Sequence, residues 1–533
     1  MQIRILGTTD LHMNLRSFDY YSDTPEPTIG LTRTASLIRE ARTEAQAEGS
    51  TVLLFDNGDS LQGTPVGDMA AEQADKPHAL MQALGALEYD AIGLGNHDFG
   101  FEGNILDRIL SQAPCPVVCS NVHRPGANEV WQDQAVLTRR VEVAGNQASL
   151  TVGVFSVVPP QTRNWESHRL GDDVRIDDIL TCARTKVSEL RSNGCDVIIA
   201  LAHTGLGSAD PAPNLENAII PLAAIEGIDA IIAGHTHPTL PGKSHAELEH
   251  VDATGGMVHG TPVVMPGSAG SHLGVIDLTL TTTTEKGWSV AAHRVELRPV
   301  SGADPAPEDP SLVALFSDGH SATRKQAEEP IGHTDQHLHS YFSFCAKDRG
   351  LAMVAAAQAS AVRQNLKGTA HEATPLLSAV APSKFGGRAG PRFYSDIPAG
   401  VMRMRHVANP AYQRISDLRF DGQAVTVEQR FVVALNNFRA SGGGHFPFIR
   451  DAEIINVPAL PIQHALKDYL TGAMPAESLE QGPCPFRFAP MPGSSVLLKT
   501  GQQAQRHLAD IAEFSPTLAG RDAEGFLRIQ LSL

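Results

Sequence analysis

Short apolar runs alternate with longer amphipathic stretches over the first half of the chain. Apolar runs of about four to eight residues are typical of strands buried on both faces, and the stretches between them predict helices. This alternation predicts an α/β domain. The predicted strands are Ile3–Leu6, Val52–Phe55, Ala91–Leu94, Val117–Val118, Val152–Val158, Val197–Ala202, Ala230–Ala233, Val263–Met265 and Val275–Leu280. The predicted helices are Thr32–Ala47, Pro77–Leu87, Asp178–Ser192 and Asn214–Ala224.

The pattern changes after residue 300. Residues 299–310 are rich in Pro, Asp and Ala, which is typical of a linker, and Ser311–Glu328 can form a helix. A second region begins with a predicted helix at Leu351–Val362 and then becomes rich in Gly and Pro. We therefore predict a first domain over 1–300, a linker with a helix over 301–329 and a second domain over 330–533.

Polar side chains follow five of the predicted strands, at the carboxyl edge where open α/β sheets bind ligands. Carboxylates together with imidazoles suit Zn, Mn, Fe or Co rather than Mg or Ca alone. The candidates are too many for one ion, and a shared carboxylate can bridge two cations. Adjacent glycines would let the backbone turn sharply. The sequence therefore predicts a two-metal site with the ligands Asp10, His12, Asp59, Asn96, His203, His235 and His237.

Composition narrows the class of substrate. The chain has 533 residues, 42% of them hydrophobic, and a formal net charge of −17, so it can bury a large core. The acidic balance argues against a protein that holds long nucleic acid, and an acidic protein that binds phosphate needs a local cation. Six scattered cysteines without a C-x-x-C pair argue against a disulfide framework. No apolar run is long enough to span a bilayer, and no signal peptide is recognisable.

The ordered motifs resemble those of the calcineurin-like metallophosphoesterases: Asp10-x-His12, Gly58-Asp59, Gly95-Asn96-His97, His203 and Gly234-His235-Thr236-His237. Three further segments resemble the 5′-nucleotidase family, and within it the bifunctional 2′,3′-cyclic-nucleotide 2′-phosphodiesterase/3′-nucleotidases: Asp10–Leu15 with Phe18–Tyr21, Gly30–Ala35, and Asp56–Gly63. The resemblance implies a four-layer α-β-β-α sandwich and a second α+β domain that binds the nucleotide.

The resemblance also implies a role for each ligand. One metal ion would be held by Asp10, His12 and His237, the other by Asn96, His203 and His235, with Asp59 as the bridge. His97 would act as a general acid or stabilise the transition state. The family often pairs this histidine with an aspartate three residues later, but Gly100 stands at that position. Asp98, or a residue from elsewhere in the chain, is therefore the candidate to orient His97.

In the second domain, the resemblance points to residues that would recognise the nucleoside. Asn436–Gly444 resembles the family motif whose aromatic residue stacks on the base, which makes Phe438 and Asn436 candidates. The other interpretation of Phe438 is a core residue beside a glycine turn. Arg388, in the Lys384–Gly390 loop, is a third candidate, or alternatively a solvated surface residue. No second stacking aromatic can be assigned.

Three histidines in an H-x-x-x-H-x-H pattern, His333, His337 and His339, also invite a metal interpretation. No Cys or carboxylate motif accompanies them, so we interpret them as surface or interdomain residues.

We expect an enzyme that hydrolyses nucleoside 2′,3′-cyclic phosphates and 3′-nucleotides with a metal-activated water. A 5′-nucleotidase or nucleotide-sugar hydrolase with the same site is one alternative, and a non-catalytic nucleotide-binding protein is another. Two divalent metal ions are the expected cofactors and a small nucleotide the expected partner, with no protein partner implied. The resemblance implies a periplasmic or extracellular location, whereas the lack of an export signal leaves the cytoplasm open.

Overall fold

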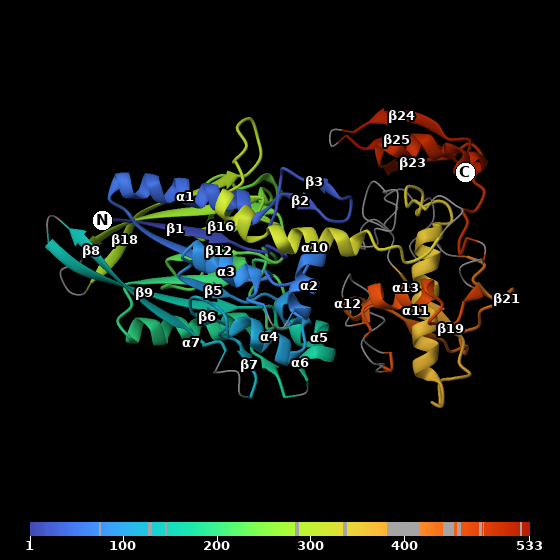
Figure 1. The fold of residues 1–533 in the computed structure, drawn as a ribbon, viewed down its shortest axis with the longest axis horizontal. Coiled ribbons are helices and arrows are strands. Elements are labelled where there is room, and N and C mark those ends of the chain that lie inside the picture. The colour runs from blue at the N-terminus through green and yellow to red at the C-terminus, as the bar shows by residue number, and fades with distance from the viewer. Residues whose placement is uncertain are drawn as a thin grey trace. The chain divides into compact units, whose positions relative to one another are not determined.

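The computed structural model describes residues 1–73, 76–125, 130–143, 146–171, 173–282, 287–333, 338–380, 416–440, 452–455, 460–478, 482, 484–522 and 525–533, without the side chains of residues 168, 437 and 438. The chain forms two compact units, Met1–Glu329 and Pro330–Leu533. Figure 1 shows the first unit in blue to yellow and the second in yellow to red.

The first unit contains two sheets. One has the strand order β18-β17-β1-β4-β5-β6, with bounds Trp288–Pro299, His272–Thr282, Gln2–Thr8, Thr51–Asp56, Ala91–Gly93 and Val117–Val118. The other has the order β14-β15-β16-β12-β11-β9-β8, with bounds Val251–Asp252, Met257–Val258, Thr261–Pro266, Ala230–Ala233, Val197–Ala202, Asn146–Val157 and Ala135–Val143. A short strand, β13 (Thr239–Leu240), pairs with β16. Two small antiparallel pairs complete the strands: β2 (Phe18–Asp19) with β3 (Thr24–Pro25), and β7 (Val122–His123) with β10 (Arg175–Ile176).

The two sheets pack face to face. Their shared core contains Ile5 and Phe55 from the first sheet and Ile199 and Ile232 from the second, all fully buried. Gly7 lets the sheets approach, because a Cβ at this position would lie 2.8 Å from Cδ1 of Ile232. Continuous apolar strands are therefore explained by burial on both faces of each sheet.

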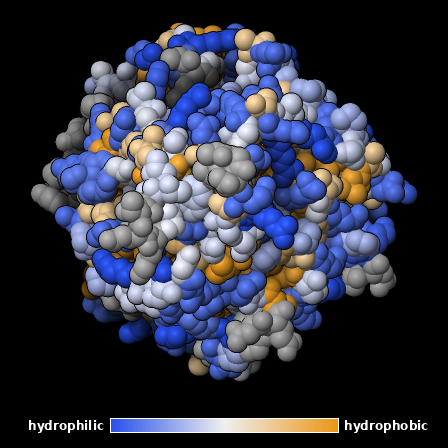
Figure 2. Space-filling view, turned by 90° about the vertical axis from the view of Figure 1, so that its left-hand side faces the viewer, coloured by the Kyte–Doolittle hydropathy of each residue, from blue (hydrophilic) through white to orange (hydrophobic). Residues whose placement is uncertain are grey.

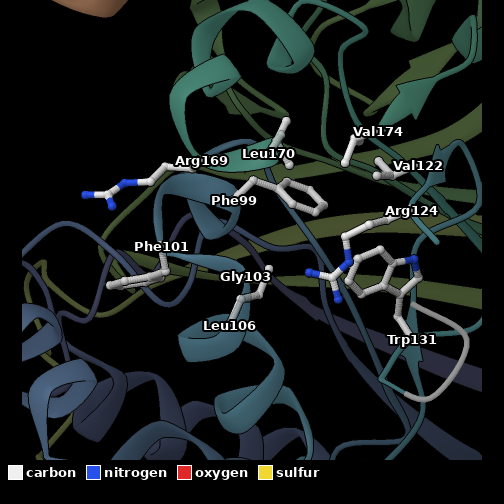
Figure 3. Close-up of a pocket in the computed structure, with 10 residues that line it drawn as sticks. All are labelled: Phe99, Phe101, Gly103, Leu106, Val122, Arg124, Trp131, Arg169, Leu170 and Val174. Carbon is white, nitrogen blue, oxygen red and sulfur yellow. The ribbon is translucent and has the colours of Figure 1, made fainter. Parts of the chain in front are cut away.

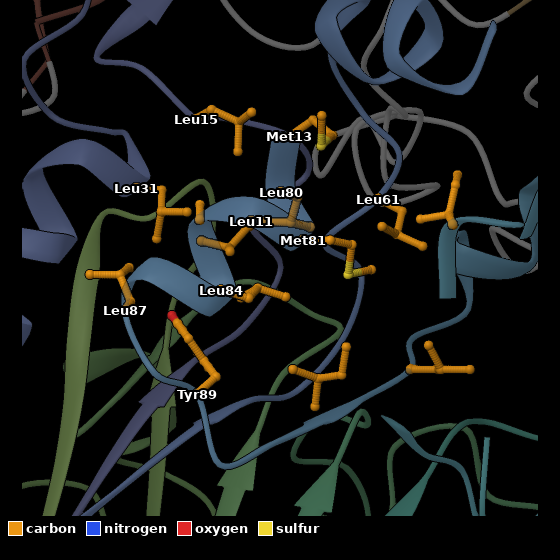
Figure 4. Close-up of a cluster of buried hydrophobic side chains, with 14 of the residues drawn as sticks. Leu11, Met13, Leu15, Leu31, Leu61, Leu80, Met81, Leu84, Leu87 and Tyr89 are labelled. Atoms are coloured by element: carbon orange, nitrogen blue, oxygen red, sulfur yellow. The ribbon is translucent and has the colours of Figure 1, made fainter. Parts of the chain in front are cut away.

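Helices cover the outer faces of both sheets. The first sheet is covered by helices that include α1 (Leu31–Glu48), α3 (Ala79–Ala86) and α4 (Gly103–Leu110). Figure 4 shows Leu80, Met81 and Leu84 of α3 in this apolar layer. The second sheet is covered by α7 (Ile179–Ser192) and α8 (Ile219–Ala223). The predicted four-layer α-β-β-α sandwich is confirmed.

All nine predicted strands are present, since each coincides with part of a strand of the two sheets. The prediction of a helix over Asn214–Ala224 is wrong for its first half, because only Ile219–Ala223 is helical. The preceding residues are tied to Thr204, whose hydroxyl donates to the carbonyl of Glu216 and accepts from the N–H of Ala218. A contact between segments thus replaces the local helical hydrogen bonds.

The segment 301–329, which composition suggests as a linker, packs on the first unit as α9 (Pro310–Leu315) and α10 (Ser317–Ala327). Asp309 caps α9 by accepting from the N–H groups of Ser311 and Leu312, and its other oxygen accepts from Arg39 of α1. Glu308 accepts from Arg16 and from Thr32. These contacts join the segment to the amino-terminal part of the fold.

The first unit also has further short helices. They are α2 (Pro65–Glu72), α5 (Thr162–Trp165), α6 (Ser167–Leu170) and the 3-10 helices η1 (His97–Gly100) and η3 (Lys243–His245). No helix in the described part of the chain combines the length and apolar character that crossing a membrane requires. Figure 2 shows one face of the molecule, on which hydrophilic residues predominate and hydrophobic residues form small separate areas.

The second unit mixes helices and short strands. Its helices are α11 (Arg349–Leu366), α12 (Asn437–Ala440), α13 (Ile462–Leu470) and the 3-10 helix η7 (Gln502–Phe514). Its strands are β19 (Leu376–Ser378), β20 (Arg419–Phe420), β21 (Gln423–Ala424), β22 (Val432–Ala434), β23 (Ser495–Thr500), β24 (Thr517–Arg521) and β25 (Leu527–Ser532). The last three form an antiparallel sheet against which η7 packs.

Candidate active site

The strand pairing brings the polar motifs together. In β1 and β4, which are parallel neighbours, Thr8 lies opposite Asp56, so the segments that follow both strands start side by side. In the second sheet, Ala202 of β11 lies opposite Ala233 of β12 in the same way. The segments that follow these four strands therefore meet where the two sheets face each other.

Close approach, rather than a sharp turn, explains two of the adjacent glycines. A Cβ on Gly234 would lie 2.3 Å from Oγ1 of Thr9, and a Cβ on Gly95 would lie 2.2 Å from Oδ1 of Asp59. The left-handed backbone conformation, which non-glycine residues rarely adopt, is found at five of the seven predicted ligands. Their φ angles are +51° at Asp10, +46° at His12, +53° at Asp59, +74° at His235 and +71° at His237. Such strain is typical of functional sites.

The first donor group contains Asp10, His12 and His237. Oδ1 of Asp10 lies 3.4 Å from Nε2 of His237 and 3.9 Å from Nε2 of His12. The two imidazole Nε2 atoms are 3.2 Å apart. Asp10 is fully buried, whereas the side chain of His237 is 47% exposed, so the group opens toward solvent.

The second donor group contains Asp59, His203 and His235. Nε2 of His203 lies 3.0 Å from Oδ2 of Asp59 and 3.8 Å from Oδ1 of Asp10, which links the two groups. Nδ1 of His235 lies 2.8 Å from Oδ1 of Asn96. All seven predicted ligands therefore lie in one cluster of side chains.

For His12, His203 and His235, a contact on the far side of the ring determines which nitrogen faces the cluster. Nδ1 of His12 donates to the carbonyl of Gln62 at 2.8 Å, and Nδ1 of His203 donates to the carbonyl of Asn57 at 2.9 Å. Nε2 of His235 lies 3.2 Å from the carboxylate of Glu216. Such contacts hold a metal-binding imidazole in the tautomer that leaves its other nitrogen free.

Trp165 of α5 supports the ring of His235. The two rings stack with centroids 5.6 Å apart and planes 17° apart. Sequence reasoning missed Trp165, Glu216 and Gln62 as partners of the ligands. Only Gln62 carried a signal, because it lies within the segment Asp56–Gly63.

The charge of the cluster calls for a cation. Burial alone would raise the pKa of Asp59 and lower that of His203, but their close contact reverses both shifts. Asp59 and Asp10 together raise the pKa of His203 to about 10. In the metal-free protein a proton on His203 thus supplies the positive charge that two buried carboxylates require.

The donor set fits two divalent ions. Nε2 of His203 is buried and has no hydrogen-bond partner within the described residues, although it faces two carboxylates. When Nε2 of His235 donates a hydrogen bond to Glu216, Nδ1 of His235 and Oδ1 of Asn96 are both hydrogen-bond acceptors. These two atoms then repel each other unless a cation lies between them. Imidazole and carboxylate ligands in two groups suit Zn, Mn, Fe or Co.

His97 lies beside this cluster but belongs to neither donor group. Its ring centroid is 5.3 Å from that of His12, and its backbone N–H donates to Oδ1 of Asp59 at 2.7 Å. The side chain is exposed, as a group that meets a substrate must be. η1 therefore presents His97 at the open side of the cluster.

The prediction that Asp98 orients His97 is wrong. Nδ1 of His97 lies 3.3 Å from Oε1 of Gln62, and the Asp98 carboxylate makes its hydrogen bonds elsewhere. Gln62 also occupies the space beside Gly100, since a Cβ on that glycine would lie 2.7 Å from Oε1 of Gln62. The glutamine amide thus stands where the family places a carboxylate.

Asp98 instead joins two ligand-bearing loops. Its buried carboxylate accepts from four backbone N–H groups, with Oδ2 bonded to Asp59 and Gly95 at 2.8 Å each and Oδ1 bonded to Ser60 and Leu61 at 3.1 and 3.0 Å. These hydrogen bonds are enough to explain why the Asp98 carboxylate is buried, without a catalytic role.

We expect Asp98→Ala to destabilise the first unit by about 3 kcal/mol or more, because several buried N–H groups lose their acceptor at about 1–3 kcal/mol each. Thermal and urea unfolding would measure the change. The matched control is Asp252→Ala, since Asp252 also accepts from backbone N–H groups, of Thr254 and Gly255, but in an exposed turn. Equal effects of the two substitutions would contradict this role of Asp98.

A small cavity of about 70 Å³ lies behind η1. Figure 3 shows Phe99 directed into it between Leu170 and Trp131. Phe99 and Trp131 pack edge to face with centroids 6.0 Å apart, and Arg124 lies over the Trp131 ring at 4.7 Å. The aromatic packing anchors the turn that carries His97.

The predicted nucleoside-binding residues belong to the second unit, and the structure describes them only in part. Oδ1 of Asn436 accepts from the backbone N–H of Arg439 at 2.9 Å, so Asn436 caps α12. Arg388 and the side chain of Phe438 lie outside the described residues, as does His337.

Comparison with known proteins identifies the family. A family model described as calcineurin-like phosphoesterase matches residues 3–239. The chain is 30% identical over its whole length to a Haemophilus influenzae 2′,3′-cyclic-nucleotide 2′-phosphodiesterase/3′-nucleotidase, 95% of which it covers. It is 37% identical, over 77% of its length, to the protein of the same name from Salmonella typhimurium, and spans 64% of that protein. It spans only 38% of the trifunctional nucleotide phosphoesterase YfkN of Bacillus subtilis, at 30% identity over 88% of this chain.

Solved structures agree with this assignment. The calcineurin-like phosphoesterase YfkN from Bacillus subtilis is 34% identical with a TM-score of 0.58, and the match covers 62% of this chain and 99% of that one. A 5′-nucleotidase precursor from Thermus thermophilus shares the fold, with a TM-score of 0.56 at 20% identity over 90% of this chain and 98% of that one. The chain therefore belongs to the 5′-nucleotidase family of calcineurin-like phosphoesterases, whose members are metal-dependent phosphoesterases.

Proposed function

We propose that this chain hydrolyses nucleoside 2′,3′-cyclic phosphates to 3′-nucleotides, and 3′-nucleotides to nucleoside and phosphate. The observation that carries the proposal is the pair of linked donor groups with His97 beside them. The substrate class rests on the names of the Haemophilus and Salmonella relatives. Relatives named 5′-nucleotidase are less similar, at 25–27% identity over 64% of the chain, so 5′-nucleotides are the second candidate substrate of this proposal.

Two divalent ions are the cofactors of this proposal. Asp10, His12 and His237 would hold one, and Asn96, His203 and His235 the other, with Asp59 shared between them. When bound, two such ions supply Lewis acidity, which offsets phosphate charge and lowers the pKa of a water that can attack phosphorus. The net charge of −17 is then compatible with an anionic substrate, because the charge is reversed locally.

The chain's own groups orient the reaction. His97, exposed at the open side of the cluster, can donate a proton or an N–H···O hydrogen bond to the leaving ribose oxygen. Gln62 fixes its ring through Oε1, while the carbonyl of the same residue holds His12. A single residue thus sets the position of both a ligand and the proton donor.

The second unit supplies nucleoside recognition in this proposal. Phe438 would stack on the base, which tolerates any base because each has a π-face, and Asn436 and Arg388 would contact the nucleotide. The enzyme would act on small nucleotides rather than on long nucleic acid. A location outside the cytoplasm, which the family resemblance implies, stays a prediction.

A panel of nucleotides tests the proposal. The chelated protein should release no phosphate, and Mn²⁺ or Zn²⁺ should restore turnover of 2′,3′-cyclic AMP and 3′-AMP above that of 5′-AMP. Preference for 5′-AMP or a nucleotide-sugar would favour the second candidate. Tight binding of 3′-AMP without turnover of any phosphoester after metal addition would indicate a binding protein and contradict the proposal.

We expect Gln62→Ala to lower kcat about 10-fold while the metal content stays unchanged, by analogy with the loss of a hydrogen-bonding partner of a metal-binding imidazole. The carbonyl that holds His12 is kept in this variant, so only the contact with His97 disappears. Gln62→Glu, which keeps an acceptor oxygen, should retain more activity than Gln62→Ala. Steady-state kinetics with Gln82→Ala as an exposed control would decide; a loss of metal would assign Gln62 to the metal site instead.

A further inference from the structure

A third group of potential metal ligands belongs to the second unit: His339, His507 and Asp510. Their donor atoms all lie within 4.8 Å of one another. We infer that these three side chains form a binding site for one zinc-class divalent cation. The site is independent of the proposed hydrolysis, since none of its residues takes part in that reaction.

The backbone explains why the three residues meet. His507 and Asp510 are three residues apart on η7. η7 is kinked at His507, whose φ and ψ of −119° and 16° are not helical, so the kink and not a regular helical repeat brings these two side chains together. His339 comes from a segment far earlier in the chain, and its Nε2 lies 2.7 Å from Oδ2 of Asp510. The site therefore links two segments that the sequence separates by 171 residues.

Aromatic packing holds the two imidazoles in place. Tyr341 lies beside both rings, with centroids 5.3 Å from His339 and 5.6 Å from His507 and planes within 30° of parallel. The two imidazole centroids are 4.4 Å apart. Tyr341 is buried in a small apolar core together with Ile511 of η7, so the potential ligands are positioned by a packed core.

The donor atoms differ in access. The side chain of His339 is 12% exposed, and its Nδ1 is buried with no hydrogen-bond partner within the described residues. Among the described residues, the polar contact of the ring is therefore made through Nε2, toward Asp510. Asp510 is 53% exposed, which leaves the site open for an ion and a water.

The chemistry favours zinc over calcium or magnesium. Two imidazoles and one carboxylate with an open fourth position form a common zinc donor set. Ligands of a tetrahedral ion with bonds near 2.0 Å lie about 3.3 Å apart, so His339 and Asp510 must separate by a few tenths of an ångström. The exposed Asp510 side chain can rotate to do so. The contact of His339 with Asp510 lies within the second unit, and the interpretation of His339 as a surface or interdomain residue stays a prediction.

Metal counting on the full chain tests this inference. Wild type, His507→Gln and Asp510→Asn would be stripped with chelator, equilibrated with ZnCl₂, freed of excess metal and analysed by elemental mass spectrometry. We expect both variants to hold one zinc ion per chain fewer than wild type. Zinc should also raise the thermal stability of wild type more than that of either variant, because binding to the folded state stabilises it.

The controls separate this site from the active site and from a simple ion pair. His464→Gln changes an exposed histidine of α13 and should hold as much zinc as wild type. Phosphate release from 3′-AMP should be unchanged in all variants, so failure of the proposed function would not affect the metal count. Asp510→Asn keeps the size of an exposed side chain and covers the case in which His507→Gln does not fold. Equal zinc content in all four proteins would overturn the inference and leave His339 and Asp510 as an ordinary ion pair.

Discussion

Replacing Asp59 with asparagine is expected to lower kcat/KM by at least about 10³-fold, which corresponds to about 4 kcal/mol of lost transition-state stabilisation. Asp59 is the only carboxylate of the second donor group and contacts His203 at 3.0 Å. Asparagine has the same size as aspartate but no negative charge, so it cannot stabilise bound cations or a protonated His203 as Asp59 does. Kinetics with 3′-AMP and metal analysis of the purified variant would measure the loss.

A neighbouring buried carboxylate provides the control. Asp56 is 2% exposed and lies three residues from Asp59, but it accepts from the hydroxyls of Thr8 and Ser60 and belongs to neither donor group. Burial raises its pKa to about 6, so a neutral side chain is tolerated there better than at Asp59. Asp56→Asn should keep the metals and stay within about 10-fold of wild-type activity. Equal losses in both variants would contradict the special role of Asp59.

His97→Ala should keep its metal content but slow hydrolysis of 3′-AMP by about 10²–10⁴-fold, the usual contribution of a general acid. The expectation follows from the position of His97, which lies beside His12 but outside both donor groups. A ribose oxygen is a poor leaving group that needs a proton. p-Nitrophenyl phosphate has a leaving group that needs none, so its hydrolysis should fall much less.

The two substrates and the metal count make this prediction specific. His293→Ala, at an exposed position on β18, is the matched control and should be close to wild type. Loss of metal from His97→Ala would make His97 a ligand. An equal loss with both substrates would mean that His97 stabilises charge rather than donating a proton.

Much of the first unit could be predicted from the pattern of apolar residues. Strands such as Val197–Ala202 are buried at every position, and this leaves a continuous apolar run in the sequence. The prediction over Asn214–Ala224 was wrong in its first half because Thr204, from another segment, takes the hydrogen bonds of its backbone. A local pattern contains no information about such a partner.

The roles of residues around the ligands were harder to predict. Asp98 stands next to His97 in the sequence, but η1 directs its carboxylate to the backbone of the Asp59 loop. Gln62, 35 residues away, reaches the ring instead. The H-x-x-x-H-x-H spacing likewise gives no indication of the actual neighbours of His339, which lie on η7.

By itself, the sequence determined the layer architecture of the first unit and the types of ligand at its strand ends, because burial and strand termination are local properties of a chain. The tertiary structure alone decided which donors meet and which ring nitrogen His12, His203 and His235 offer. His203 and Asn57 are 146 residues apart, and Asp10 and His235 are 225 apart. Their contacts depend on how two sheets pack and how strands are registered, which hydrogen bonds and side-chain shape settle only once the whole unit has folded.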